Sequence, residues 1–185
     1  MEIRDLKGKL IGVINYDYED SNYNDLLVKD IVVNKITESL KMVRLSDDVL
    51  EKKFNELSSR DKNKVILASK LHDKVIILKN FSKGLIKNDI EYFKNLFKKI
   101  INYNKKIILI DNNTEIFLNC VDNIVVYEQN EIIYETNDIY DINLSKYCDL
   151  PKLVEFINIS SKFGIHINHY LEIDELLKAI YRIKS

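Results

Sequence analysis

Apolar positions recur along this chain in two periods, one typical of buried strands and the other of amphipathic helices. Three short runs are apolar at nearly every position, as in parallel strands that are covered on both faces. They span residues 10–14, 74–78 and 106–110. Elsewhere apolar side chains return every three or four residues, which is typical of one helix face. This period predicts helices over 26–43, 47–57 and 89–103, and a further one that begins after Ser58. The alternation predicts an α/β fold with a largely parallel sheet.

The last third of the sequence predicts smaller pieces. A short helix is expected over 116–121, and a hairpin over 123–127 and 131–135 with Gln129 and Asn130 at its turn. The single proline, Pro151, then opens two apolar helical segments separated by Gly164. We therefore expect one domain over 1–148, with a helical subdomain at about 26–72, and a small helical appendage over 149–185.

Composition and charge exclude several classes of protein. Twenty-eight basic and 29 acidic residues give a net charge of −1, so no long-range field is expected to attract nucleic acid or anionic lipid. No apolar run approaches the roughly 20 residues that span a bilayer, and the first ten residues lack the apolar segment of a signal peptide. The sequence therefore predicts a cytoplasmic location, without membrane insertion.

The metal-ligating residue types are few and scattered. Cys120 and Cys148 lack the spacing of a zinc site and are expected to be reduced thiols. His166 and His169 are three residues apart, but neither a cysteine nor a third histidine accompanies them, so no metal is expected. His72 falls on the apolar stripe of the helix after Ser58, and a packed histidine is the simpler interpretation.

One stretch, Leu57–Lys79, has an order of motifs that is found in a known family. Leu57, Ser58, Ser59, Arg60 and Asp61 are followed by an amphipathic helix and then by an apolar strand that ends at Lys79-Asn80. This order resembles the signature loop, helix and Walker B strand of ABC transporter ATPases. The segments 12–20, 82–85 and 149–176 are similar to further motifs of the energy-coupling factor (ECF) type, including its "LP" tail. The resemblance covers nearly all of this chain but only about the last two-thirds of a full ATPase subunit, and it implies a truncated P-loop NTPase core.

The residues at the reactive positions depart from the family. No P-loop motif occurs in the sequence. The resemblance places Lys79 and Asn80 at the Walker B carboxylates, Tyr16 at the Q-loop glutamine and Asn112 at the switch histidine. In the signature loop, Ser59 and Arg60 replace the two glycines and Asp61 replaces the glutamine. These replacements predict that the chain does not hydrolyse ATP, because each such group usually contributes orders of magnitude in rate.

The resemblance leaves three functions open. The first is a catalytically inactive subunit or scaffold that contacts another ABC ATPase, a membrane coupling protein or a second copy of itself, with peripheral attachment to the inner face of the membrane. The second is a free-standing interaction or regulatory module. The third is a nucleotide-binding protein that holds ATP and Mg²⁺ only when a partner supplies the P-loop. Arg60 could then contact a phosphate, although a solvated polar turn is the simpler interpretation of Arg60 and Asp61. No cofactor is expected otherwise.

The resemblance also raises a question about the sheet. In the family, the P-loop strand lies between the switch-histidine strand and the strand that follows it. Without a P-loop strand, we expect either an unpaired edge or direct pairing of 106–110 with 124–127, and we expect rearrangement or a partner to close the gap, because an open edge favours aggregation.

Overall fold

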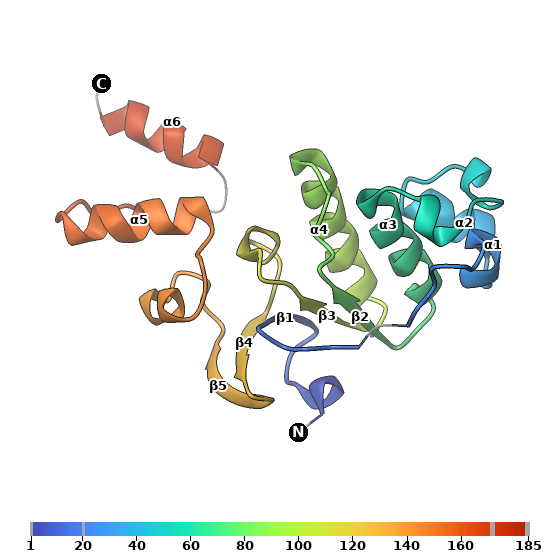
Figure 1. Cartoon of the computed structure of the whole chain (residues 1–185). Helices are drawn as coiled ribbons and strands as arrows, with labels where there is room; N and C mark the ends of the chain where they lie inside the picture. Colours follow the sequence, from blue (N-terminus) through green and yellow to red (C-terminus); the bar gives the residue numbers. More distant parts are fainter. Residues whose placement is uncertain (1, 20, 171–172, 184–185) are drawn as a thin grey trace.

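A computed structural model describes residues 2–19, 21–170 and 173–183 of the protein. A five-stranded sheet forms its centre, in the order β2-β3-β1-β4-β5 (Figure 1). The strands are β1 (Leu10–Ile14), β2 (Val75–Lys79), β3 (Lys106–Ile110), β4 (Asn123–Glu128) and β5 (Glu131–Thr136). The first four are parallel and β5 pairs antiparallel with β4. The predicted α/β fold and the predicted hairpin are therefore confirmed.

The position of β1 differs from both expectations for the sheet. β1 pairs with β3 on one side and with β4 on the other, so β3 and β4 are neither adjacent nor left with an open edge. Gly12 makes this central position possible, because a Cβ there would lie 3.0 Å from ring atoms of Phe117. β1 occupies the place that the resemblance assigns to the P-loop strand. The described sheet therefore has no gap between β3 and β4.

Four helices follow one another on one face of the sheet and beside it (Figure 1). They are α1 (Val28–Ile31), α2 (Ile36–Met42), α3 (Ser59–Lys70) and α4 (Lys87–Ile101). The expected helix over 26–43 is instead two short helices, because the backbone turns at Lys35, where φ is +43°. α3 begins after Ser58 as expected, because the Ser58 hydroxyl accepts a hydrogen bond from the Asp61 N–H.

Two further helix predictions are wrong. Residues 47–57 form only two 3₁₀ turns, Asp47–Val49 and Phe54–Glu56, because their backbone groups bond across the chain. The N–H of Val28 donates to the Lys52 carbonyl, and the N–H of Phe54 donates to the Leu26 carbonyl. Residues 116–121 likewise form no α-helix; a 3₁₀ turn, Thr114–Ile116, is followed by further turns.

Apolar side chains pack on both faces of the sheet. Leu10 and Ile14 of β1 belong to the larger core beneath α3 and α4, which includes Phe81, Phe93 and Phe97. Ile11 and Val13 point to the other face, where a thinner layer from the N-terminal turn and the loop after β1 covers them. This explains why β1 is apolar at every position.

The C-terminal segment forms the expected pair of helices, α5 (Lys152–Lys162) and α6 (Ile173–Ile183). They join the body through a third cluster that contains Leu118, Tyr140, Val154 and Leu176. Of the helices in the described ranges, none has the length and apolar character needed to cross a membrane.

Candidate functional site

The carboxyl ends of β2, β3 and β1 lie side by side, since the three strands are parallel and adjacent. In α/β proteins this edge is where ligands commonly bind. Lys79 and Asn80 end or follow β2, Asn112 follows β3, and Tyr16 follows β1. The structure therefore brings four of the sequence-predicted site positions to one edge.

The first backbone donor after β1 already has a partner. Asn15 is left-handed, with φ of +58°, and its N–H donates to Asn112 Oδ1 over 3.2 Å. Asn80 is also left-handed, at +50°, and its N–H donates to the Ile110 carbonyl over 2.7 Å. Asparagine tolerates this conformation better than most residues. Both strands thus end in tight turns whose donors bond within the chain.

Lys79 connects the end of β2 to the loop after β1. Its ammonium group lies 3.1 Å from Asp17 Oδ1 and donates to the Tyr18 carbonyl over 2.7 Å. Asp17 is largely exposed, so the ion pair itself contributes little stability. The hydrogen bond to the Tyr18 carbonyl also orients the Lys79 ammonium group. The two contacts together hold the loop after β1 against the carboxyl end of β2.

The buried carboxylate of Asp111 holds two of the loops, a role that sequence reasoning missed. Its Oδ2 accepts the N–H of Ser82 over 2.9 Å, and its Oδ1 accepts the N–H of Asn113 over 3.0 Å. An aspartate directly after a buried strand is the sequence signal that could have suggested such a turn.

The first turn of α3 is fastened to the loop after β2. The side-chain amide of Asn63, a second residue that sequence reasoning missed, donates toward the carbonyls of Asn80, Phe81 and Lys83 at 2.9–3.2 Å. Gly84 packs so closely that a Cβ there would lie 3.0 Å from the Arg60 backbone nitrogen. The loop Leu57–Asp61 and the end of β2, which were predicted as separate motifs, are therefore held side by side by these contacts.

Arg60 is not the solvated turn residue that was expected. Its Nη2 donates to Asp89 Oδ1 over 2.9 Å, and its Nε lies 2.6 Å from Asp89 Oδ2, in poor alignment for a hydrogen bond. Burial by itself raises the pKa of the Asp89 carboxyl, but the hydrogen bond from Arg60 and the charge of Lys64 outweigh it, so this pKa lies below its usual value. Arg60 is thus committed to a buried partner.

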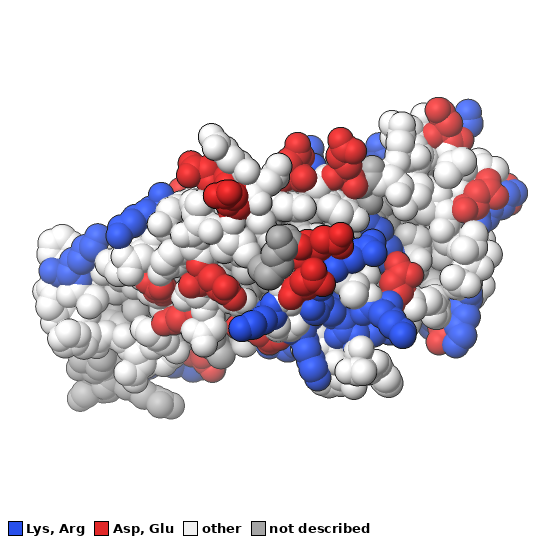
Figure 2. Space-filling view, turned by 90° about the horizontal axis from the view of Figure 1, so that it is seen from below, with Lys and Arg blue, Asp and Glu red and all other residues white. Residues whose placement is uncertain are grey.

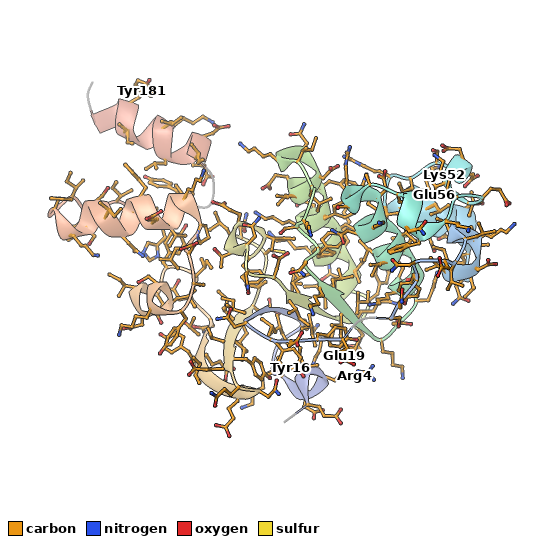
Figure 3. All side chains as sticks on the ribbon, in the orientation of Figure 1. Arg4, Tyr16, Glu19, Lys52, Glu56 and Tyr181 are labelled. Carbon is orange, nitrogen blue, oxygen red and sulfur yellow. The ribbon has the colours of Figure 1, made fainter. Side chains whose placement is uncertain are left out.

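Tyr16 points away from the strand ends. Its ring packs edge-to-face on Tyr127, with ring centroids 4.7 Å apart, in the thinner apolar layer. Figure 3 shows it below the strands, beside the N-terminal turn. The backbone of Tyr16 belongs to the edge, whereas its side chain does not.

A shallow hollow of about 440 Å³ lies beyond the ends of β1 and β3. Asn15 and Asn112 line one side of it, and residues 145–149 line the other. The ammonium group on its wall, that of Lys146, donates to Asn143 Oδ1 over 2.9 Å. Cys148 also lines the hollow, and burial raises the pKa of its thiol to about 11, so it stays protonated at neutral pH.

The histidines form no metal site within the described ranges, where no group of three metal-ligating side chains occurs. The ring of His169 stacks on Tyr140, with centroids 4.0 Å apart. His72 is exposed, which contradicts its interpretation as a packed residue, and its Nε2 lies 3.4 Å from Ser39 Oγ.

Comparison with solved structures identifies similar folds. A post-hydrolysis dimer of the ATP-binding cassette MJ0796 with ADP and phosphate matches with a TM-score of 0.53 and 16% identity, over 67% of this chain and 62% of that chain. The ADP conformation of MJ1267, an ATP-binding cassette of an ABC transporter, matches with a TM-score of 0.51 and 14% identity, over 75% of this chain and 67% of that chain. The chain has an ABC ATPase-like fold.

The chain spans 44–67% of the length of the cassettes that it matches. No family model and no curated protein matches its sequence.

Proposed function

We propose that this chain is a catalytically inactive ABC ATPase-like protein that serves as a non-catalytic subunit or scaffold of an ABC transporter of the ECF type. The observation that carries the proposal is the position of Lys79. An ABC ATPase needs a carboxylate at the end of this strand to organise Mg²⁺. Here the strand ends in an ammonium group that is bonded to Asp17 and to the Tyr18 carbonyl.

The neighbouring donors support the same proposal. Phosphate sites at strand ends depend on backbone N–H groups that point at the ligand. In this chain the N–H of Asn15 bonds to Asn112, and the N–H of Ser82 bonds to Asp111. The residues present do not fit a Mg²⁺–nucleotide complex, and we derive no catalytic step for them.

The signature-type loop gives little support to the third candidate, a nucleotide completed by a partner's P-loop. Arg60 would have to leave Asp89, which is 2% exposed, to reach a phosphate. Asp61 would place a negative charge beside Ser58, with which it exchanges hydrogen bonds. The free-standing module remains the second candidate, because nothing in the fold depends on a transporter.

In the proposed role, the chain contacts a complete ABC ATPase subunit, a membrane coupling protein or a second copy of itself, at the cytoplasmic face of the membrane. It needs no cofactor of its own.

Two measurements test the proposal. Thermal unfolding of the isolated chain with and without Mg-ATP should give the same midpoint, whereas a bound ligand at about 100 times its Kd stabilises by about 2.7 kcal/mol, which is several degrees. An ATPase with an intact P-loop is the positive control. ATP turnover would reject catalytic inactivity, and a clear ATP-dependent rise of the midpoint would reject the argument that these residues do not hold nucleotide.

The second measurement is affinity capture of the tagged chain from detergent-solubilised native membranes, with partners identified by mass spectrometry. We expect a full-length ABC ATPase or a polytopic membrane protein. Recovery of the bait alone would reject the subunit role and favour the free-standing module.

A further inference from the structure

Basic residues lie opposite one another at the amino ends of the parallel strands β1, β2 and β3. β1 pairs with β3 so that Leu10 lies beside Ile107, and β2 pairs with β3 so that Val75 lies beside Lys106. Lys9 is therefore next to Lys106. One row earlier, Lys74 is next to Lys105, and the Lys106 N–H donates to the Lys74 carbonyl. Paired strands are about 4.8 Å apart, so the backbones of these four lysines lie close together. The side chains of successive rows diverge, since Lys106 Nζ reaches the N-terminal turn and Lys105 Nζ reaches the loop before β2, so the lysines meet only at the end of the sheet.

More basic residues reach the same edge from neighbouring segments. Lys106 Nζ donates to the carbonyls of Arg4 and Leu6, which brings the N-terminal turn to this edge. Lys7 lies between that turn and β1, and Lys99 lies in the last turn of α4, shortly before β3. We call the whole set the basic edge: Arg4, Lys7, Lys9, Lys74, Lys99, Lys105 and Lys106.

The positive charge of the basic edge is not balanced by ion pairs. None of its seven members forms an ion pair with a carboxylate of the described ranges. Lys105 Nζ donates to two neutral carbonyls, those of Leu71 and Asp73. Carboxylates beside the edge offset part of the charge without forming ion pairs: Asp122 and Glu135 line a hollow with Lys7, and Asp73 precedes Lys74. Asp122 accepts the backbone N–H groups of Lys9 and Leu10.

The view from below shows basic side chains right of centre, with acidic side chains beside them (Figure 2). The whole-chain net charge of −1 averages over such local groups of lysines, which is why it suggested no field for anionic lipid. Like charges on adjacent strands oppose pairing. An arrangement that keeps them together is favoured when an anionic partner neutralises them.

We propose that the basic edge docks this chain on an anionic lipid surface. Six of its seven members are lysines, which act as point charges and suit diffuse attraction to head groups better than bidentate recognition of a single phosphate. Tyr103, 80% exposed, lies between Lys99 and Lys105, where an aromatic ring can enter the head-group layer. Single-stranded nucleic acid binding would call for several stacked aromatic rings, and Tyr103 is the one large exposed ring near these lysines in the described chain.

The docking needs no transporter subunit, so it can be measured on the isolated full chain. Co-sedimentation is compared between vesicles of phosphatidylcholine alone and vesicles with about 30 mol% phosphatidylglycerol. We expect binding to the anionic vesicles only, and weaker binding as salt is raised.

A matched pair of triple variants identifies the surface. Lys9→Gln, Lys74→Gln and Lys99→Gln together remove three exposed charges of the basic edge, and partitioning to anionic vesicles should fall by about 100-fold. The control combines Lys41→Gln, Lys162→Gln and Lys178→Gln, which are exposed elsewhere and remove the same charge; its partitioning should fall by less than about threefold. Circular dichroism and thermal unfolding verify that both variants fold.

Three results would overturn the proposal: equal binding to neutral and anionic vesicles, equal losses in the two variants, or binding of single-stranded RNA without binding of vesicles. None of them bears on affinity capture of an ABC ATPase, so failure of the docking and failure of the subunit role are distinguishable.

Discussion

The ion pair between Arg60 and Asp89 gives the sharpest test of how this structure is held together. Arg60→Met keeps most of the apolar stem but leaves the carboxylate of Asp89 at 2% exposure without its hydrogen-bonding cation. Removing one partner of a fully buried pair costs about 3–5 kcal/mol, but the Arg60 side chain is 41% exposed, so water replaces part of the lost contact. Lys64, itself 3% exposed, remains nearby and offsets part of the charge. We therefore expect Arg60→Met to lower the free energy of unfolding by about 2 kcal/mol at pH 7, below the fully buried range.

An exposed ion pair of the same chain provides the control. Lys29 and Glu51 lie 2.8 Å apart, but their side chains are 41% and 74% exposed. Lys29→Met should change the free energy of unfolding by less than about 1 kcal/mol. Urea unfolding followed by circular dichroism measures both variants against the original protein. The two cations are equally exposed, so equal effects of Arg60→Met and Lys29→Met would refute the argument that burial of the carboxylate sets the cost.

The stability difference between the original protein and Arg60→Met should depend on pH, whereas a loss of packing alone would give a difference that does not. In the original protein the folded pKa of Asp89 lies below the unfolded value of about 3.9, so its contribution is complete above that value and is lost as the pH falls through the folded pKa. In Arg60→Met, burial should raise the folded pKa above the unfolded one, and protonation then favours the folded state. The stability difference between the two proteins should therefore shrink from pH 7 to pH 5. A constant difference would contradict this account.

Three further predictions follow from other parts of the structure. Gly84→Ala should destabilise by about 2–4 kcal/mol, because φ is +80° and the Cβ would lie 3.0 Å from a backbone nitrogen, whereas Gly164→Ala, with φ of +77° and no atom within 4 Å, should cost about 1 kcal/mol in the same urea experiment. Burial raises the pKa of the thiols of Cys120 and Cys148 to about 12 and about 11, so iodoacetamide should modify both slowly at pH 8, Cys120 more slowly, and both rapidly in urea; rapid labelling of the folded chain would contradict this. Asn130→Ala should destabilise by about 1 kcal/mol, because φ is +66° in the β4–β5 turn and alanine tolerates this conformation less well than asparagine, and an unchanged thermal midpoint would contradict the turn geometry.

Elements that local pattern determines were predictable from the sequence. β3 and the β4–β5 hairpin lie where the apolar periodicity placed them, and α4 begins two residues early. The apolar side chains that their periodicity assigns to the core are buried in it or pack against it. Phe93 and Phe97 of α4, for example, are fully buried. In these segments local propensity and tertiary packing favour the same structure.

The helix expected over 47–57 failed because a distant segment competes for its backbone. Residues 26–29 accept or donate the hydrogen bonds that a helix would have satisfied internally, and Leu27 bridges to Lys53. Periodicity reports only which side chains are apolar. It contains no information about a pairing partner more than 20 residues away.

The candidate site was predictable in its positions but not in its contacts. The resemblance pointed to Lys79, Asn80 and Asn112, and the parallel order of the strands then brings them to one edge. That Lys79 bonds to Asp17 depends on where β1 lies, and the sequence resemblance did not give that place. Asp111 was not predicted because one of its two hydrogen bonds goes to Ser82, which is distant in the sequence, and local pattern gives no sign of that contact.

Similarity along the sequence and similarity in space assign β1 to different parts of an ABC ATPase. Residues 12–20 resemble the Q-loop region, whereas the sheet order places β1 where the P-loop strand would be. In the loop that follows β1, the Asn15 N–H bonds to Asn112 and the Asp17 carboxylate pairs with Lys79. Polar groups at the carboxyl edge are therefore largely bonded to one another, whereas the cations of the basic edge, at the opposite end of the strands, form no ion pair with a carboxylate of the described ranges. Because surface groups without an internal partner are the ones available to another molecule, we infer that the function of this chain depends on contacts made outside the carboxyl edge of the sheet.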